Sequence, residues 1–303
     1  LHGYRFPRIS PASFGQINNH AEMKLKQNGF QIIKNQFGRK LLKSELDEIL
    51  TDRNIVGSIA GLELYDKETL KASNLEIISR LGSGLDNIDL NAARDNKISI
   101  CSTPDGPINS VAELTLGMMI YLSRNILAMN NDMKLGKWKR IYGNLLEGKS
   151  ISLIGFGRIG KRVYDLLKPF NCNVYIVDPA LKKGKYENIL TLEEALPISD
   201  IISFHLSSNK EIISDLNIQN LKKGVILLNS ARGNIINERS LIYGIENNIV
   251  SSSWIDVFEV EPYQGNLKNY ENVLLTPHIG SLTIESRLKM EDETVQNIIK
   301  YYI

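Results

Sequence analysis

The fold is decided by the stretch Ile151-Ser152-Leu153-Ile154-Gly155-Phe156-Gly157-Arg158-Ile159-Gly160. A short aliphatic run leads directly into three glycines with the spacing G-x-G-x-x-G, and apolar residues then recur at helical spacing as far as Phe170. Each glycine has a mechanical reason. The first allows a tight turn, the second lets the backbone approach a pyrophosphate, and the third lets the helix pack closely on the sheet. The order of strand, glycine turn and helix therefore predicts a dinucleotide-binding crossover.

The next predicted strand, Val174 to Val177, ends in Asp178. Its carboxylate could accept hydrogen bonds from both ribose hydroxyls and would repel a 2′-phosphate, which favours NAD over NADP. The helix N-terminus would offer free N–H groups to the phosphates. Arg158 and Ile159 lie inside the phosphate turn, so we group them with the glycines as cofactor-binding residues. The structural alternatives are a glycine turn of no consequence and an acid that only begins a turn before Pro179.

Short β-rich runs alternate with helical patterns along most of the chain, which indicates an α/β fold with parallel sheets. Six strands are predicted from residue 150 onward, in the order of a doubly wound sheet: 151–154, 174–177, 201–204, 225–228, 254–258 and 273–275. The first third carries four more runs, at 30–33, 55–60, 75–79 and 98–101. Long helical patterns cover Ser110 to Asn125 and Ile284 to Tyr302. Periodicity alone leaves open where the terminal helix packs.

Composition bounds the class of protein. The chain has 303 residues, 43% of them hydrophobic, and 36 basic against 34 acidic residues leave a charge of only +2. So small a charge argues against nucleic-acid or membrane-surface partners. The two cysteines, Cys101 and Cys172, form no CxxC pair, which excludes a disulfide scaffold and a cysteine zinc site; we predict no metal. The longest apolar stretch, Val111 to Leu122, is too short to span a membrane. We expect a soluble, cytoplasmic protein.

Three further segments follow predicted strands, where ligands bind in open α/β sheets: 229–233, 256–262 and 276–280. They contain Arg232, Glu261 and His278, which supply a guanidinium, a carboxylate and an imidazole. An enzyme that transfers a hydride to or from a 2-hydroxy acid needs these groups. Arginine clamps a carboxylate with two contacts, and histidine exchanges the hydroxyl proton. A carboxylate beside the imidazole would fix its tautomer and favour its protonated form.

With these motifs the chain resembles the NAD-dependent D-isomer-specific 2-hydroxyacid dehydrogenase family, and it is most similar to the phosphoglycerate dehydrogenase-like branch. The resemblance covers nearly the whole chain. Besides the segments quoted above, it rests on Phe37-Gly38-Arg39, Ile59-Ala60-Gly61-Leu62-Glu63, Arg80-Leu81-Gly82-Ser83-Gly84-Leu85-Asp86-Asn87-Ile88-Asp89-Leu90 and Val111-Ala112-Glu113-Leu114.

The resemblance implies a role for individual residues. Arg232 matches the substrate-binding arginine, Glu261 the partner of the catalytic histidine, and His278 that histidine. Asp256 matches an acid on the nicotinamide carboxamide side. Backbone N–H groups of Ser83 and Gly84 would hold the substrate carboxylate. The remaining cofactor positions are Ser230 and Ala231 in the nicotinamide pocket, His205 and Asn209 in the adenine-side loop, and Gly280.

Structural alternatives stand beside these roles. Arg232 could be a surface ion-pair residue, Glu261 a loop acid, and His278 a structural histidine. Asp256 could be buried with a pairing partner, because it lies in a strand-like apolar run, and Ser83 with Gly84 could be only a turn. The chain also departs from the family pattern in three places: His205-Leu206-Ser207 instead of His-x-Pro, the loop 103–110, and Ser281 after Gly280.

We therefore predict a Rossmann NAD-binding domain at 103–280 and a smaller, flavodoxin-like α/β substrate-binding domain at 1–102 and 281–303, discontinuous in sequence. The first substrate candidate is 3-phospho-D-glycerate. Glyoxylate, hydroxypyruvate or a sugar acid is the alternative within the family, and a non-catalytic NAD-sensing interaction protein is the alternative outside it. The family resemblance also implies a homodimer, and we expect the apolar helix Ser110 to Asn125 at its interface.

Overall fold

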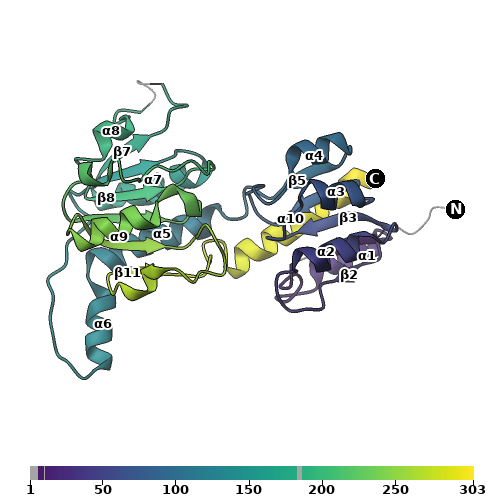
Figure 1. The fold of residues 1–303 in the computed structure, drawn as a ribbon, viewed down its shortest axis with the longest axis horizontal. Helices are drawn as coiled ribbons and strands as arrows, with labels where there is room; N and C mark the ends of the chain where they lie inside the picture. Colours follow the sequence, from purple (N-terminus) through teal and green to yellow (C-terminus); the bar gives the residue numbers. More distant parts are fainter. Residues whose placement is uncertain (1–5, 10, 183–185) are drawn as a thin grey trace. The chain divides into compact units, whose positions relative to one another are not determined.

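The computed structural model describes residues 6–9, 11–182 and 186–303, and the chain divides into two compact units (Figure 1). The first comprises Leu1–Pro107 and Leu282–Ile303, and the second comprises Ile108–Ser281. The first unit extends past residue 102 because the segment that follows is bonded to it. The Thr103 N–H donates to the Gly82 carbonyl, and the Gly106 carbonyl accepts from the Ser286 hydroxyl.

The first unit holds a parallel five-stranded sheet in the order β2-β1-β3-β4-β5, which is the flavodoxin-like order. Its strands are β1 (Phe6–Ile9), β2 (Ile33–Lys34), β3 (Ile55–Ala60), β4 (Ile77–Arg80) and β5 (Ser99–Ser102). Its helices are α1 (His20–Gln27), α2 (Lys43–Leu50), α3 (Lys67–Ala72), α4 (Leu90–Asp95) and α10 (Ile284–Tyr302). Strand β1 was not among the predicted runs, and β2 shares only Ile33 with the run predicted at 30–33.

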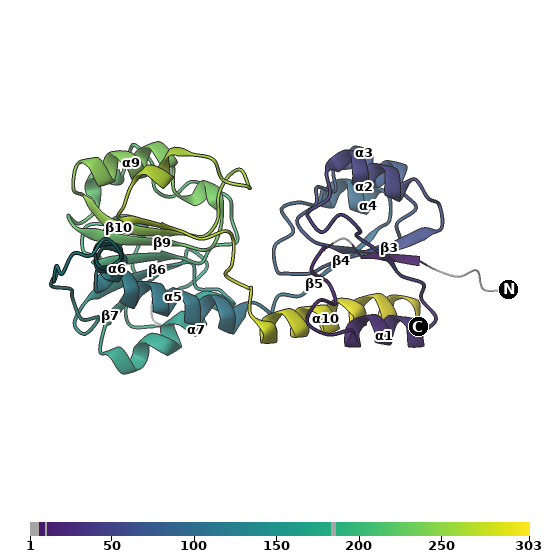
Figure 2. The same ribbon diagram turned by 90° about the horizontal axis from the view of Figure 1, so that it is seen from below.

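Helices cover both faces of this sheet. In Figure 2, α2, α3 and α4 lie on one face, and α1 and α10 lie on the other. The terminal helix α10 buries Met290, Val295 and Ile298 in one core with Leu25 of α1 and Phe14. This packing answers the question that periodicity left open, because the last helix of the chain completes the unit that contains the first strands.

The second unit holds a parallel six-stranded sheet in the order β11-β10-β9-β8-β6-β7. Its strands are β6 (Ser150–Ile154), β7 (Asn173–Val177), β8 (Ile201–Phe204), β9 (Val225–Asn229), β10 (Val250–Ile255) and β11 (Val273–Leu275). Its α-helices are α5 (Ile108–Ser123), α6 (Ile126–Lys134), α7 (Arg158–Leu167), α8 (Leu192–Ala195) and α9 (Glu238–Glu246). Short 3₁₀ helices are η1 (Lys168–Phe170), η2 (Ile218–Asn220), η3 (Gly233–Ile235) and η4 (Asn266–Asn269).

The doubly wound α/β fold expected from the sequence is confirmed in this unit. In Figure 2, α9 lies on one face of the sheet, and α5 and α7 lie on the other. A parallel bridge between Ile176 and Ile189 adds a one-residue remnant of a further strand beside β7. The strand order reverses between β6 and β8, and a reversal of this kind is where α/β sheets bind their ligands.

Two predicted boundaries were wrong in ways that bear on function. The strand expected at 254–258 is β10, which ends at Ile255, so Asp256 follows the strand instead of lying inside it. The long helix expected to reach Asn125 ends at Ser123. Asn125 has a φ of 51°, and the chain turns there into the separate helix α6, which projects from the body of its unit (Figure 1). No helix within the described ranges is long and apolar enough to cross a membrane.

Candidate active site

The strand register brings the carboxyl ends of all six strands of the second unit to one edge of the sheet. Ile154 is paired with Val177 and with Phe204, Phe204 with Asn229, Asn229 with Ile255, and Ile255 with Leu275. All six strands therefore end level with one another. The residues that immediately follow them share this carboxyl edge: Gly155, Asp178, His205, Ser230, Asp256 and Thr276. Five of these six were predicted as site residues.

The glycine turn fits the phosphates of a dinucleotide. Gly155 has a φ of 94°, and a Cβ there would come within 2.8 Å of the His205 main chain. A Cβ on Gly160 would overlap the Gly155 carbonyl oxygen, so helix α7 can pack this closely only without a side chain. At Gly157, by contrast, a Cβ would meet nothing within 4 Å. Gly157 is the N-cap of α7 and carries no capping side chain, so the space beside the start of the helix is open to an anion.

Asp178 is tied to the same turn. Its Oδ2 accepts the Phe156 N–H at 2.8 Å, and its Oδ1 accepts the Ala180 N–H at 2.9 Å. The second contact is the turn function that the structural alternative assigned to this acid. An ionised carboxylate has about four lone-pair sites. Two therefore remain for ribose hydroxyls, and the acid fits a diphosphate cofactor with a free 2′-hydroxyl.

His205 lies on the other side of the glycine turn. Its N–H donates to the Ile154 carbonyl at 2.7 Å, and its Nε2 lies 3.0 Å from the Ser203 hydroxyl. Burial lowers the pKa of His205 to about 4, so its imidazole is neutral near pH 7. It can therefore offer a flat, uncharged surface beside the turn, but no charge to a phosphate. Asn209 is exposed in the loop that follows.

His278 and Glu261 form the pair that the sequence suggested. Nδ1 of His278 lies 3.0 Å from Oε2 and 3.2 Å from Oε1 of Glu261. An ionised carboxylate can only accept, so Nδ1 carries the proton of this contact and Nε2 is the nitrogen that can meet a substrate. Oε1 of Glu261 also accepts the Phe258 N–H at 3.1 Å. The imidazole is 42% exposed and can be reached by a small molecule.

Asp256 anchors the turn that carries His278. Its side chain is 1% exposed, and its oxygens accept the Thr276 hydroxyl at 2.6 Å and the N–H groups of Ile279 and Gly280 at 2.8 Å each. Its carbonyl accepts the His278 N–H at 2.9 Å, and His278 has a φ of 54°. This turn needs to be held, because an L-residue adopts that backbone region only at a cost. The arrangement matches the structural alternative for Asp256; its contact with the cofactor stays a prediction.

Arg232 is positioned by Asn229, the last residue of β9. The Asn229 amide donates to the Arg232 carbonyl at 2.8 Å, and its oxygen accepts the Ala231 N–H at 3.1 Å. Arg232 itself is half-buried, and its Nη1 donates to the Ala231 carbonyl at 2.7 Å. Ser230 and Ala231 are half-buried at the carboxyl edge of the sheet, next to the end of β10, which Asp256 follows.

The residues expected to hold the substrate carboxylate belong to the first unit. Ser83 and Gly84 follow β4, and Ser83 is exposed while Gly84 is half-buried. The turn before them is fixed by Gly82, which has a φ of 140° and donates its N–H to the Thr103 hydroxyl at 2.8 Å. The structure thus gives Ser83 and Gly84 a defined turn at the carboxyl edge of their own sheet.

Sequence reasoning missed the residues that hold the reactive ones. Asn229, Thr276 and Trp254 are examples; Trp254 is fully buried and donates its indole N–H to the Thr276 hydroxyl at 2.8 Å. An asparagine at the end of a strand, before two small residues, is a turn signal that could have indicated Asn229. Nothing local distinguishes Trp254 from an ordinary core residue.

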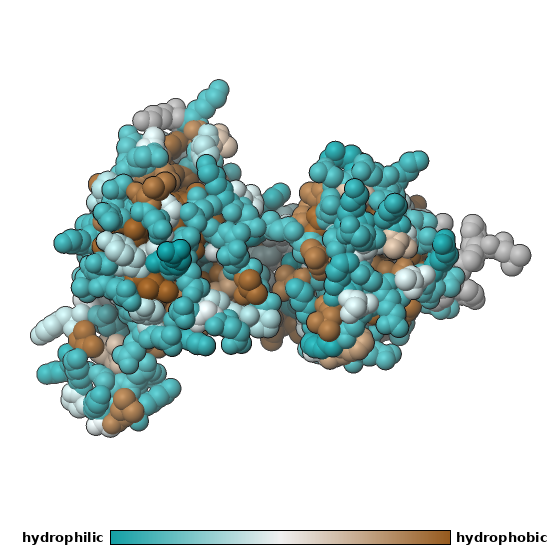
Figure 3. Space-filling model, in the orientation of Figure 1, coloured by the Kyte–Doolittle hydropathy of each residue, from teal (hydrophilic) through white to brown (hydrophobic). Residues whose placement is uncertain are grey.

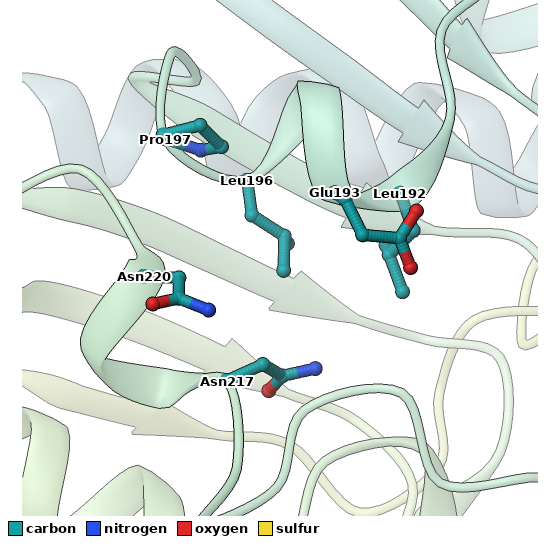
Figure 4. Close-up of a pocket in the computed structure, with 6 residues that line it drawn as sticks. All are labelled: Leu192, Glu193, Leu196, Pro197, Asn217 and Asn220. Atoms are coloured by element: carbon teal, nitrogen blue, oxygen red, sulfur yellow. The ribbon is translucent and has the colours of Figure 1, made fainter.

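A pocket of about 350 Å³ lies elsewhere in this unit and is drawn in Figure 4. It is lined by Leu192, Glu193, Leu196, Pro197, Asn217 and Asn220. These residues precede β8 and β9, so the pocket lies toward the amino ends of these strands, away from the residues described above. The Asn217 side chain is already bonded to Ile212 and Ser214. We assign the pocket no part in the chemistry.

Comparison with known proteins agrees with this geometry. Residues 116–280 match the family described as "D-isomer specific 2-hydroxyacid dehydrogenase, NAD binding domain". The hydroxypyruvate reductase of Thermotoga maritima is 35% identical over 270 residues, which cover 86% of this chain and 88% of that protein. The chain belongs to the D-isomer specific 2-hydroxyacid dehydrogenase family. It is therefore an NAD-dependent oxidoreductase, as the glycine turn and Asp178 indicated, and the prediction of this family is confirmed.

Other relatives lie on the phosphoglycerate dehydrogenase side of the family. The D-3-phosphoglycerate dehydrogenase of Bacillus subtilis is 36% identical over 241 residues, 76% of this chain but 46% of that protein. The chain spans about half the length of the curated phosphoglycerate dehydrogenases that it matches. Among solved structures, an NAD⁺-bound 3-phosphoglycerate dehydrogenase of Entamoeba histolytica has a TM-score of 0.84 at 26% identity, with 99% of this chain and 96% of that chain covered.

Proposed function

We propose that this dehydrogenase interconverts a D-2-hydroxy acid and its 2-oxo acid with His278 as the proton-transferring group. The single observation that carries this proposal is the Glu261–His278 pair, because it leaves Nε2 directed away from the carboxylate with the imidazole accessible. Bound NADH supplies the hydride for the carbonyl carbon in the direction of reduction. A non-catalytic NAD sensor would have no need for this pair.

Each protein group has a separate task in the proposed reaction. In reduction, His278 donates a proton from Nε2 to the substrate oxygen as negative charge develops there. Glu261 accepts the Nδ1 proton and so keeps Nε2 turned toward the substrate oxygen. Arg232 offers a planar guanidinium for a two-point contact with the substrate carboxylate. Ser83 and Gly84 remain the predicted backbone N–H donors for a substrate carboxylate. Proton donation of this kind contributes about 10²–10⁴-fold.

The first substrate candidate is 3-phospho-D-glycerate. Its support comes from relatives, several of which are D-3-phosphoglycerate dehydrogenases. Hydroxypyruvate is the second candidate, because the Thermotoga maritima reductase matches this chain over nearly the full length of both. Consumption of NADH with 3-phosphohydroxypyruvate, hydroxypyruvate, glyoxylate and pyruvate, each titrated to saturation, tests the choice. We expect the highest kcat/KM with the phosphorylated acid; a higher value with hydroxypyruvate would transfer the assignment to the second candidate.

Asp178 should make the enzyme selective for NADH over NADPH. A 2′-phosphate would have to lie beside this half-buried carboxylate, and the two negative charges repel each other. We expect NADPH to bind at least tenfold more weakly in a fluorescence titration. Equal affinities for the two cofactors would show that Asp178 does not face the ribose.

We also propose that the chain forms a homodimer, and we place its contact on α6 and the loop after it, beside the helix expected from the sequence. Apolar side chains of α5 are buried inside its own unit, where Ala112, Met119 and Leu122 share a core with α7. Exposed apolar side chains gather instead on α6 and the loop after it, where Figure 3 shows hydrophobic patches on the projecting arm. The most exposed are Leu135, Trp138, Tyr142 and Leu145.

Light scattering should give twice 34.1 kDa at micromolar concentration, and a variant with both Trp138→Asp and Tyr142→Asp should give the mass of one monomer. A 34.1 kDa particle for the unmodified protein would contradict the dimer.

A further inference from the structure

We propose that Tyr263, through the contact of its ring with Phe258, is the positioning residue that holds Glu261 against His278. This inference rests on the proposed function, because it needs the Glu261–His278 pair to be the proton-transferring unit. It adds a residue that neither the motif nor the spacing of the catalytic groups indicates.

The first step is the hydrogen bond that orients Glu261. The Phe258 N–H donates to Oε1 of Glu261 at 3.1 Å, while both oxygens of the same carboxylate face Nδ1 of His278 at 3.0 and 3.2 Å. The carboxylate is thus held between a main-chain donor and the imidazole. If Phe258 moves, the donor moves with it, and the distance between Glu261 and His278 is no longer fixed.

The second step is what holds Phe258. Its ring stacks on the ring of Tyr263 with centroids 4.2 Å apart and planes 22° apart. These two residues are the ends of the segment 258–263, which contains Glu261. The contact between their rings therefore closes this loop around Glu261. Between the two rings, Glu259 and Pro262 are exposed, and Val260 is 71% exposed. Both rings pack against the buried core that contains Ile255, and the stack joins the two ends of the loop over that core.

The third step is what holds Tyr263. Its hydroxyl oxygen accepts the N–H of Leu267, a buried residue of η4, at 2.9 Å. The carboxylate of Glu238, the first residue of α9, lies near this hydroxyl and contributes to the raised pKa of Tyr263. A Cβ on Gly265 would overlap the Tyr263 ring, so the main chain crosses directly over the ring at that point. Burial raises the pKa of Tyr263 to about 12, so the hydroxyl remains a donor throughout the pH range of an enzyme assay.

Among the residues that the structure describes, Glu261 is the carboxylate in hydrogen-bond contact with the imidazole of His278. Glu261 faces the imidazole, Glu238 faces the Tyr263 hydroxyl, and the Asp256 carboxylate is directed at the N–H groups of the turn after His278. A change at Tyr263 should therefore reach the imidazole through the position of Glu261.

The test compares pH profiles of 2-oxo acid reduction. Reduction needs a protonated imidazole, so its rate falls toward high pH, and loss of the Glu261 contact moves this fall to lower pH. Tyr263→Leu removes the ring contact and should move the midpoint in the same direction as Glu261→Gln, with kcat lowered roughly tenfold. KM for NADH should not change. Tyr263→Phe keeps the stack and should restore most of the unmodified profile.

Tyr270→Leu is the matched control. Tyr270 is also half-buried, and its hydroxyl donates to Glu246, the last residue of α9, at 2.7 Å. The Tyr270→Leu variant therefore loses a hydrogen bond to Glu246 of α9 and leaves the loop around Glu261 unchanged. We expect its pH profile to match that of the unmodified enzyme. Thermal unfolding of every variant, with Phe258→Leu as a second disruption of the stack, separates loss of folding from loss of positioning.

The outcomes separate this inference from the proposed function. If Glu261→Gln leaves the pH profile unchanged, the assigned pair is not the proton-transferring unit and the proposed function fails. If Glu261→Gln shifts the profile while Tyr263→Leu and Phe258→Leu do not, the pair stands and the positioning role is refuted. Tyr263→Leu added to Glu261→Gln should shift the profile no further; an additional shift would also refute action through Glu261.

Discussion

A Cβ atom on Gly233 would overlap the main-chain carbonyl of Phe258, so the loop after Arg232 lies directly on the loop that leads to Glu261. Gly233→Ala must therefore push the two loops apart, and it displaces both Arg232, the proposed substrate-binding residue, and Glu261, the partner of His278. We expect kcat/KM for the 2-oxo acid to fall at least tenfold, because a displacement of about 1 Å is costly in an oriented site. Steady-state kinetics measure this, with NADH affinity expected to change little.

Gly117→Ala is the control for the added methyl group. Gly117 is exposed in helix α5, and a Cβ there would meet nothing within 4 Å. Replacing a helical glycine by alanine should stabilise the protein by about 0.5–1 kcal/mol and leave the kinetics unchanged. If Gly233→Ala behaved like this control, the close contact between the two loops would have no catalytic importance.

Asp256→Asn should destabilise the protein as well as the site. The asparagine oxygen can still accept from Thr276 and Ile279, but its NH₂ group would face the Gly280 N–H, and two donors would oppose each other in a buried position. An unsatisfied buried group of this kind costs about 1–3 kcal/mol. The urea midpoint should fall accordingly, and kcat should fall because His278 stands on the same turn. An unchanged midpoint would show that Asp256 is not an anchor of the turn.

The parts of the fold that sequence predicted are those with a local signal. The glycine turn at Gly155, the acid at Asp178 and the strands on both sides have the order and spacing that a crossover demands. The end of β10 was missed because Asp256 is followed by Val257 and Phe258, which continue an apolar run after the sheet hydrogen bonds have ended. Periodicity records burial, and burial continues here beyond the strand.

The candidate site shows the same division. Arg232, Glu261 and His278 were proposed because each occupies a segment after a strand and their chemistry belongs together; the structure brings Glu261 and His278 into contact, and the catalytic roles stay predictions. Tyr263 was not found, because its importance depends on contacts: its ring stacks on a neighbour five residues earlier, and its hydroxyl accepts the Leu267 N–H. Such contacts depend on the local path of the chain, which composition and spacing do not specify.

His205 should make folding stability depend on pH. Burial lowers the pKa of His205 from its ordinary 6.5 to about 4, so the folded protein keeps the ring neutral where the unfolded chain would protonate it. Stability is therefore lost as pH falls from about 6.5 toward 4, by up to about 1.4 kcal/mol per pH unit from this group. His205→Gln removes the titration. Urea midpoints at pH 7 and pH 5 should differ less in the variant; an equal difference in both proteins would refute the buried neutral imidazole.

His278→Ala should lower kcat by roughly 10²–10⁴-fold and leave NADH affinity nearly unchanged. The imidazole acts on the substrate oxygen, whereas cofactor affinity depends mainly on the glycine turn and Asp178, which His278 does not support. Arg232→Lys should do the opposite: KM for the 2-oxo acid should rise strongly, because an ammonium cannot reproduce a planar two-point contact. Steady-state kinetics with a fluorescence titration of NADH separate the two effects. If His278→Ala kept a near-normal kcat, the proton would have to come from water or from another side chain, and the assignment of the Glu261–His278 pair would be wrong.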